Sequence, residues 1–203
     1  MENNFILQQY LTDRTICDKL IEYHKNSEEK GPGLSGNGEI NPDTKDSTDT
    51  DLKNDSPLYM EYLTLLKDVV DSYVNLYPDS AQNAYFGLTE GMSIQHYLPN
   101  QGYHALHCEK QHSNIQHLTR HLVFMTYLND VPDGGTEFPL QGVKTTAKKG
   151  KTVIWPAQWT HMHRGEISTT QDKYIITGWF SYDLGLISQI AKQHHLNLHS
   201  NTN

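Results

Sequence analysis

The sequence predicts an α+β chain in which helices come first and a β-sandwich or β-barrel follows. Before residue 90, apolar residues recur at helical spacing, whereas from residue 91 they fall into short β-like runs separated by turn signals. Helices followed by many short strands are typical of an α+β arrangement. A chain of 203 residues can bury a substantial core without disulfide or metal crosslinks. We therefore expect a single domain over residues 1–203.

Two candidate helices and a long connection make up the N-terminal part, residues 1–90. Thr12 can cap a first helix that ends near His24. Ser56 followed by Pro57 is a typical helix start, and an apolar stripe continues from there for about five turns. Between the helices, residues 26–57 are rich in Gly, Pro, Asp, Asn and Ser, and we interpret them as a long flexible loop.

The second part, residues 91–182, consists of short apolar runs bounded by glycine-containing turns. We predict strands at 92–97, 103–109, 121–128, 143–147, 151–155 and 173–181. A C-terminal segment, 183–203, follows, with a predicted helix over 184–195 and a polar tail.

The charge and the cysteine content exclude several classes of protein. A formal net charge of −8 argues against a nucleic-acid backbone as the main partner, because phosphate binding requires a basic face. The sequence has no run of about 18 apolar residues, which a membrane span would need, and it begins without a basic, apolar leader. Cys17 and Cys108 are too few for a disulfide framework. We expect a cytoplasmic protein with no membrane or nucleic-acid partner.

His107 and Glu109 point most directly to chemistry. Residues i and i+2 of a strand share a face, so both side chains could enter the interior of a barrel. Twelve histidines and 24 acidic residues would give about 1.4 His-x-Asp/Glu pairs by chance, and one is present. The pair alone therefore establishes nothing. A second histidine from a distant strand would complete a site with two histidines and one carboxylate, which is typical of Fe(II) enzymes that activate oxygen.

His161 and His163 both qualify as the second histidine. They also share a strand face, so periodicity leaves the choice between them open. Lys173 follows ten positions after His163. Its ammonium could pair with the far carboxylate of a dicarboxylate that chelates the metal.

Several segments, taken in order, resemble the prolyl 4-hydroxylase-like Fe(II)/2-oxoglutarate-dependent dioxygenases. Residues 97–109 (YLPNQGYHALHCE) resemble the family's first-ligand strand, where a Tyr-x-Pro-Gly segment leads into His-x-Asp. Residues 120–130 (RHLVFMTYLND) and 134–139 (GGTEFP) resemble its Tyr-Leu-Asn strand and its Gly-Gly-x-x-Phe turn. Residues 149–156 (KGKTVIWP) resemble the strand before its distal histidine. The resemblance implies a double-stranded β-helix, which is a jelly-roll, cupin-like barrel, with an N-terminal helical layer packed on it.

The resemblance also assigns a ligand set for the metal. In the family the distal histidine precedes a basic residue by ten positions, which selects His163 with Lys173. His107, Glu109 and His163 would then bind Fe(II), with no catalytic residue beyond the metal site. Glu109 departs from the family, which usually has Asp there, and the extra methylene moves the carboxylate by about 1.5 Å. We expect metal binding with altered geometry.

Further roles follow for the cosubstrates. Lys173 and Tyr127 would hold the distal carboxylate of 2-oxoglutarate (2OG), Tyr97 would line the cosubstrate pocket, and Trp179 takes the position of a family aromatic. O₂ would be the other cosubstrate, and ascorbate is a candidate reductant. The implied reaction hydroxylates an unactivated C–H bond and releases succinate and CO₂. The implied partner is a proline-containing protein or peptide, and lysine at 173 is similar to the collagen-type and algal branch.

Three other functions fit parts of the sequence. The same oxygenase chemistry could act on a free amino acid or another small molecule. A cupin-type metal module could use His161, His163 and Glu166. Finally, Glu109 could mark a non-catalytic binding domain that kept the barrel.

Overall fold

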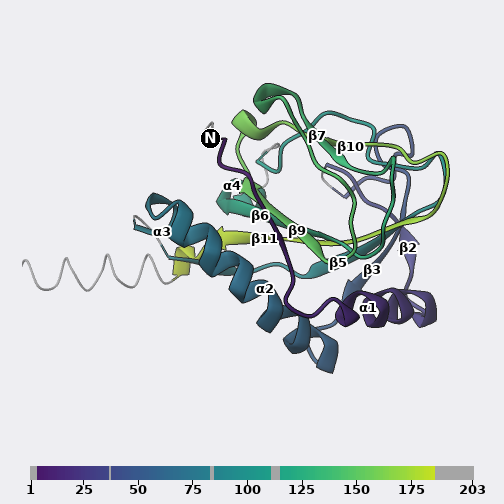
Figure 1. Ribbon diagram of the computed structural model, residues 1–203, viewed down its shortest axis with the longest axis horizontal. Helices are drawn as coiled ribbons and strands as arrows, with labels where there is room; N and C mark the ends of the chain where they lie inside the picture. Colours follow the sequence, from purple (N-terminus) through teal and green to yellow (C-terminus); the bar gives the residue numbers. More distant parts are fainter. Residues whose placement is uncertain (1–3, 37, 83–84, 111–114, 186–203) are drawn as a thin grey trace, which may run out of the picture.

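A large antiparallel sheet with helices on one face organises the described residues, 4–185 except 37, 83–84 and 111–114, of a computed structural model (Figure 1). Its strands are β1 (Leu7–Tyr10), β2 (Gly31–Pro32), β3 (Thr48–Leu52), β4 (Phe86–Leu88), β5 (Met92–Tyr97), β6 (Arg120–Tyr127), β9 (Lys151–Pro156) and β11 (Lys173–Tyr182). They pair in the order β1-β9-β6-β11-β5-β3-β2, and β4 pairs with β11.

A smaller sheet and the helices complete the described fold. The smaller sheet has the order β10-β7-β8 and consists of β7 (Thr136–Phe138), β8 (Val143–Lys144) and β10 (Arg164–Gly165). The helices are α1 (Thr15–Asn26), α2 (Pro57–Leu76), α3 (Asp79–Gln82) and α4 (Ile115–Thr119), with 3₁₀ turns η1 (Pro139–Gln141) and η2 (Trp159–His161). No helix in this part of the chain has both the length and the apolar run that crossing a bilayer requires.

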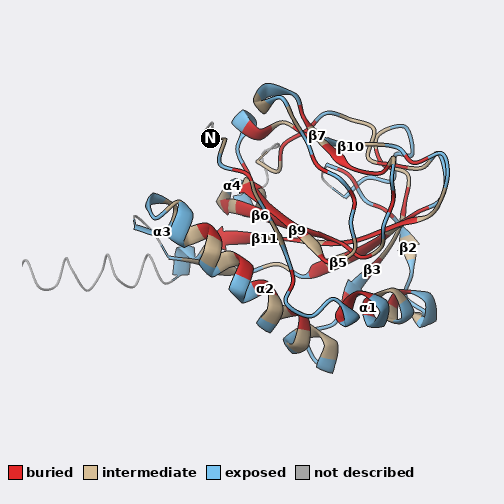
Figure 2. Cartoon of the chain, in the orientation of Figure 1, coloured by how far each residue is buried: buried red, intermediate tan, exposed pale blue. Residues whose placement is uncertain are grey.

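Strand alternation divides the buried residues between two cores. On β6, Leu122 and Phe124 pack in a core with residues of α1 and α2, whereas Val123, Met125 and Tyr127 pack on the opposite face of the sheet. That second core also contains residues of β7 and β9. Figure 2 shows buried residues along the central strands and on the sides of α1 and α2 that face the sheet. The predicted helical layer is therefore confirmed, and the second face of the sheet is where a site can form.

The two predicted N-terminal helices are present, with one boundary corrected. Ser56 caps α2, and its side chain accepts a hydrogen bond from the backbone N–H of Leu58, as predicted. Thr12, however, does not cap α1. The helix begins at Thr15, whose backbone N–H donates to the side chain of Asp13 at 2.8 Å. The carboxylate of Asp13 therefore organises this start.

Two predictions about irregular and extended segments were wrong. Residues 26–57 do not form one loop, because β3 lies within them and pairs with β5 in the main sheet. Thr50 and Leu52 of β3 are buried, but the intervening acidic residues hide the strand signal. Residues 103–109 are not a strand. Tyr103 forms an isolated β-bridge with Lys45, whereas His107 forms one with His163. No single described strand therefore pairs with the whole segment.

The remaining strand predictions differ in how well they hold. Strand β5 matches the prediction, and β6, β9 and β11 agree within one residue at each end. Of residues 143–147, only the first two form a strand. The edge strand β1 and the short β4 were not predicted and lie within the part expected to be helical. The predicted helix over 184–195 falls almost wholly outside the described residues.

Acid should destabilise this fold, in part through His24 of α1. The side chain is buried, and its Nε2 lies 3.0 Å from the carbonyl oxygen of Thr48 on β3. Burial lowers the pKa of His24 below its ordinary value of 6.5. The unfolded chain therefore binds this proton more tightly, so the stabilising contribution is complete above about pH 6.5 and is lost as the pH falls toward the lower folded pKa.

We expect the denaturation midpoint to fall between about pH 7.5 and about pH 5.5, and to fall less in His24→Gln. Urea denaturation at both pH values measures this difference. Equal losses in the two proteins would show that His24 is not one of the groups responsible.

Candidate active site

A cavity of about 290 Å³ opens on the second face of the large sheet. Interior-facing residues of β5, β6, β9 and β11 line it, together with Thr136 of β7 and Gly165 of β10. Leu34 and Lys45, from the segment between β2 and β3, also line the cavity. The cavity is therefore enclosed by both sheets and by the segment before β3.

His107 and His163 are fixed opposite each other by their own backbones. The N–H of His107 donates to the carbonyl of His163 at 3.0 Å, and the N–H of His163 donates back at 2.8 Å. The Nδ1 atoms lie 2.9 Å from the carbonyl oxygens of Ala105 and His161, respectively. A carbonyl only accepts, so each Nδ1 carries a proton and each ring directs its Nε2 toward Glu109.

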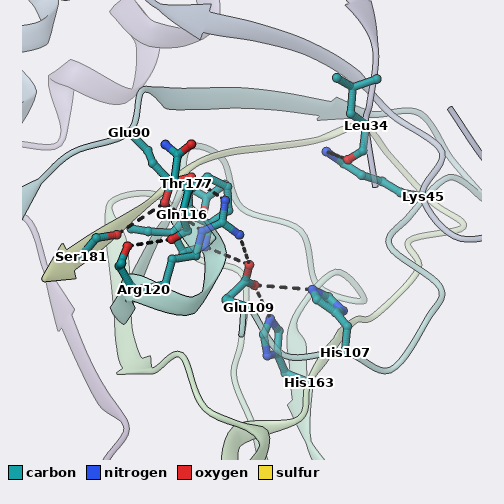
Figure 3. Close-up of polar contacts among 12 residues, drawn as sticks. Leu34, Lys45, Glu90, His107, Glu109, Gln116, Arg120, His163, Thr177 and Ser181 are labelled. Atoms are coloured by element: carbon teal, nitrogen blue, oxygen red, sulfur yellow. Dashed lines mark hydrogen bonds and ion pairs between the residues drawn. The ribbon is translucent and has the colours of Figure 1, made fainter. Parts of the chain in front are cut away.

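Both Nε2 atoms face one oxygen of Glu109. Oε1 lies 3.6 Å from Nε2 of His107 and 3.4 Å from Nε2 of His163, and all three side chains are largely buried (Figure 3). Two imidazole nitrogens and a carboxylate oxygen that converge with little access to water form a ready set of donors for a cation. Two imidazoles and one carboxylate are a donor set that fits Fe(II). The geometry thus fits the metal that the sequence led us to expect.

The ionisation of the three side chains suits metal binding. Burial alone would raise the pKa of Glu109, but the adjacent imidazoles of His107 and His163 outweigh it and hold the pKa well below its usual value. Burial, followed by the proximity of His107, lowers the pKa of His163. A charged carboxylate and a neutral imidazole are the forms that bind a metal ion.

Lys173 brings a buried positive charge into the same cavity. Its side chain is 4% exposed, and Nζ donates to the backbone carbonyl of Glu166 at 2.7 Å. Nζ also lies 5.1 Å from the ring centre of Tyr97. Within the described residues, no carboxylate lies within 4.0 Å of it, and burial lowers the pKa of Lys173 to about 8. A dicarboxylate in the cavity would supply the missing counter-charge.

Tyr127 and Tyr97 line the cavity near Lys173 but also make internal hydrogen bonds. The hydroxyl of Tyr127 lies 2.7 Å from Oγ1 of Thr136 and 2.6 Å from Oγ1 of Thr145. The hydroxyl of Tyr97 donates to Oε1 of Gln95 at 2.6 Å. Burial raises the pKa of Tyr127 to about 12, so its hydroxyl keeps its proton and remains able to donate.

Trp179 lines the cavity and contacts Glu109 directly. Its Nε1 donates to Oε2 of Glu109 at 2.8 Å. Arg120 lies over the indole ring, with its guanidinium carbon 3.6 Å from the ring centre, and its Nη1 is 3.5 Å from the same Oε2. Arg120 also forms a two-point ion pair with Glu90, at 2.9 and 2.5 Å.

Sequence reasoning gave no role to Arg120, Glu90 or Tyr103. The ring of Tyr103 stacks on His107, with 3.7 Å between the ring centres and 13° between the planes. A charged residue at the start of the otherwise apolar run of β6 was a usable signal for Arg120. Nothing in the sequence links it to Glu90, which lies thirty positions earlier.

The alternative ligands do not converge. His161 is buried, but its Nε2 lies 2.9 Å from the carbonyl oxygen of Asn4. The carboxylate of Glu166 is 2.9 Å from Nζ of Lys144. In the described ranges, His107, Glu109 and His163 are the one group of three side chains that could hold a metal ion. The cupin-type set of His161, His163 and Glu166 is therefore not assembled.

Comparison with solved structures identifies the fold. The viral collagen prolyl hydroxylase of Paramecium bursaria Chlorella virus-1, solved as a 2OG complex, superposes with a TM-score of 0.66 at 16% identity over 90% of this chain and 98% of its own. A prolyl-4-hydroxylase from Pseudomonas putida gives 0.66 at 15%, covering 89% of this chain and 94% of its own. A prolyl hydroxylase from Trichoplax adhaerens, in complex with a hypoxia inducible factor peptide fragment, gives 0.70 at 14%, covering 89% and 84%.

These identities establish the fold alone, and they confirm the expected double-stranded β-helix with N-terminal helices packed on it. A search of curated proteins found no match. The model of the 2OG-Fe(II) oxygenase superfamily matches residues 92–181, the stretch that contains His107, Glu109, His163 and Lys173. The matched stretch supplies both the convergent triad and the buried lysine, so this part of the chain is similar to the 2OG-Fe(II) oxygenase superfamily.

Proposed function

We propose that the protein is a 2OG- and Fe(II)-dependent dioxygenase that hydroxylates prolyl residues of a protein or peptide at C4. One observation carries the cofactor part of the proposal. A single cavity holds three convergent metal-binding side chains and a buried lysine that lacks a carboxylate partner within the described residues. The first group fits iron, and the second fits the distal carboxylate of 2OG.

Each residue then has a defined task. His107 and His163 would hold the metal through Nε2, and Glu109 would hold it through Oε1. Bound iron supplies the activation of O₂ that lets an unactivated C–H bond be hydroxylated. Lys173 pairs with the distal carboxylate of 2OG, and this pairing raises its pKa from about 8. Tyr127 can turn its hydroxyl proton from a threonine to the same carboxylate.

The protein's contribution is positioning and the exclusion of water rather than proton transfer. The reaction replaces a C–H bond with C–OH and needs no general base, and none of the residues above is assigned that role. Apolar and aromatic side chains, such as Met125, Ile175 and Trp155, surround the polar groups of the cavity. They exclude water from the reacting groups and strengthen the ionic contacts.

The charge balance of the cavity favours a peptide substrate over a free amino acid. Lys45 pairs with Asp49 at 2.5 Å, and Arg120 pairs with Glu90. Once 2OG occupies Lys173, each lysine and arginine lining the described cavity has an acidic partner. A free amino acid would bring an α-ammonium and an α-carboxylate that find no counter-charge, whereas a prolyl ring within a peptide is neutral. The names of the three structural neighbours support proline by analogy.

Parallel turnover of peptides and free amino acids tests this function. Protein loaded with Fe(II) is supplied with 2OG, O₂ and ascorbate, and is offered proline-rich peptides or free proline and other amino acids. We expect succinate to form with a peptide that gains one oxygen atom on proline, identified as 4-hydroxyproline after hydrolysis. The His107→Ala variant should give neither product. Turnover confined to free amino acids would overturn the peptide assignment.

A further inference from the structure

The two oxygens of the Glu109 carboxylate have different surroundings. Oε1 faces the Nε2 atoms of His107 and His163. Oε2 accepts the indole N–H of Trp179 at 2.8 Å and lies 3.5 Å from Nη1 of Arg120. Since Oε2 already accepts the indole N–H and lies beside the guanidinium, Oε1 is the oxygen free to bind a metal.

We infer, building on the proposed iron site, that Trp179 and Arg120 are positioning residues that hold Oε2 and keep Glu109 a one-oxygen ligand. Glutamate has one more rotatable bond than aspartate, and without an anchor its carboxylate can swing away from the metal or bind through both oxygens. Binding through both oxygens would occupy one of the three positions that 2OG and O₂ require. The donors on Oε2 prevent both outcomes.

The anchor is itself held rigidly. The guanidinium of Arg120 is buried and pairs with the carboxylate of Glu90 (Figure 3). One of its faces lies over the indole ring of Trp179. The hydroxyl of Ser181 also lies 3.4 Å from Glu90. Because Glu90 binds Arg120 at two points, it fixes the orientation of the guanidinium and partly neutralises its positive charge. Arg120 can therefore direct Glu109 without drawing the carboxylate away from the histidines.

Metal affinity in the variant Trp179→Phe tests this inference without relying on turnover. Phenylalanine keeps a ring beneath Arg120 but removes the N–H that Glu109 accepts. We expect anaerobic Co(II) binding, followed by calorimetry, to weaken by about tenfold or more, which is the usual effect of losing an outer hydrogen bond to a metal ligand. Trp159→Phe makes the same exchange at a 70% exposed position and should bind Co(II) like the wild type.

A double-mutant cycle with Glu109→Asp makes the test specific. The aspartate carboxylate falls about 1.5 Å short of the indole N–H. We therefore expect Trp179→Phe to weaken Co(II) binding much less in the Glu109→Asp protein than in the wild type. The paired variant Glu90→Gln/Arg120→Gln removes the other anchor without leaving a buried charge, and its Co(II) affinity should also fall, with thermal melting used to show that it is folded.

The results separate this inference from the function on which it rests. Unchanged Co(II) affinity in folded Trp179→Phe, or an equal loss in both residue-109 backgrounds, would overturn the positioning role while leaving the metal site in place. A wild-type protein that binds no Co(II) would overturn both. A loss of Co(II) affinity in Trp179→Phe that is much smaller in the Glu109→Asp background would support the inference.

Discussion

Replacing Lys173 with methionine should weaken 2OG binding by about 30-fold or more, because losing one partner of a buried charge pair costs about 2 kcal/mol or more. The variant keeps the length and apolar stem of the side chain and removes the ammonium. Anaerobic titration of the Fe(II)-loaded protein with 2OG, followed by the visible absorption of the iron–2OG chelate, measures the change.

Two companion measurements show whether the effect is electrostatic. Lys173→Arg restores a cation at the same position and should recover part of the affinity. Without 2OG, Lys173→Met should melt at the same temperature as the wild type or higher, since burying an unpaired ammonium is unfavourable. Wild-type 2OG affinity in Lys173→Met would contradict the assigned role and would favour a metal module that does not use 2OG.

Replacing His163 with alanine should abolish metal binding and turnover together. The remaining pair, His107 and Glu109, provides only two of the three donors, and the buried Glu109 carboxylate loses a neighbour that keeps it ionised. Calorimetric titration with Co(II) and the succinate assay give the two readouts.

His161→Ala is the matched control for His163→Ala. The sequence could not separate His161 from His163 by periodicity, yet the side chain of His161 lies against Asn4 and not against Glu109. Its backbone carbonyl, which holds Nδ1 of His163, remains in the variant. We expect some loss of stability with metal affinity retained. The opposite pattern, in which His161→Ala loses the metal and His163→Ala keeps it, would invalidate the triad.

The strands at the centre of the sheet were predictable because both of their faces are buried. Apolar runs such as those of β5 and β6 mark a strand with packed neighbours on each side, and their predicted bounds agree with the structure within one residue. Helix α2 was predictable from its cap at Ser56 and its long stripe. By contrast, β3 carries aspartates at positions that face away from the core, so its polar composition gave no strand signal.

The site was only partly predictable, because its geometry depends on contacts between distant segments. From the sequence, His107 and Glu109 were expected to share one face of a strand. In the structure the two side chains do converge, but the segment that carries them is not a strand. An isolated bridge to His163 fixes this irregular segment instead. The contacts of Arg120 and Trp179 with Glu109 join residues that carry no common spacing, so no periodic pattern could reveal them.

The reciprocal backbone bridge between His107 and His163 bears on which metal the protein acquires. Because main-chain hydrogen bonds set the spacing of the two rings, the folded chain presents a preformed site rather than one assembled around the ion. Co(II), Ni(II) and Cu(II) bind such ligands more strongly than Fe(II), so affinity alone does not select iron. Loading with iron then depends also on the supply of metals in the surroundings, and the divalent ions found in the purified protein should vary with that supply.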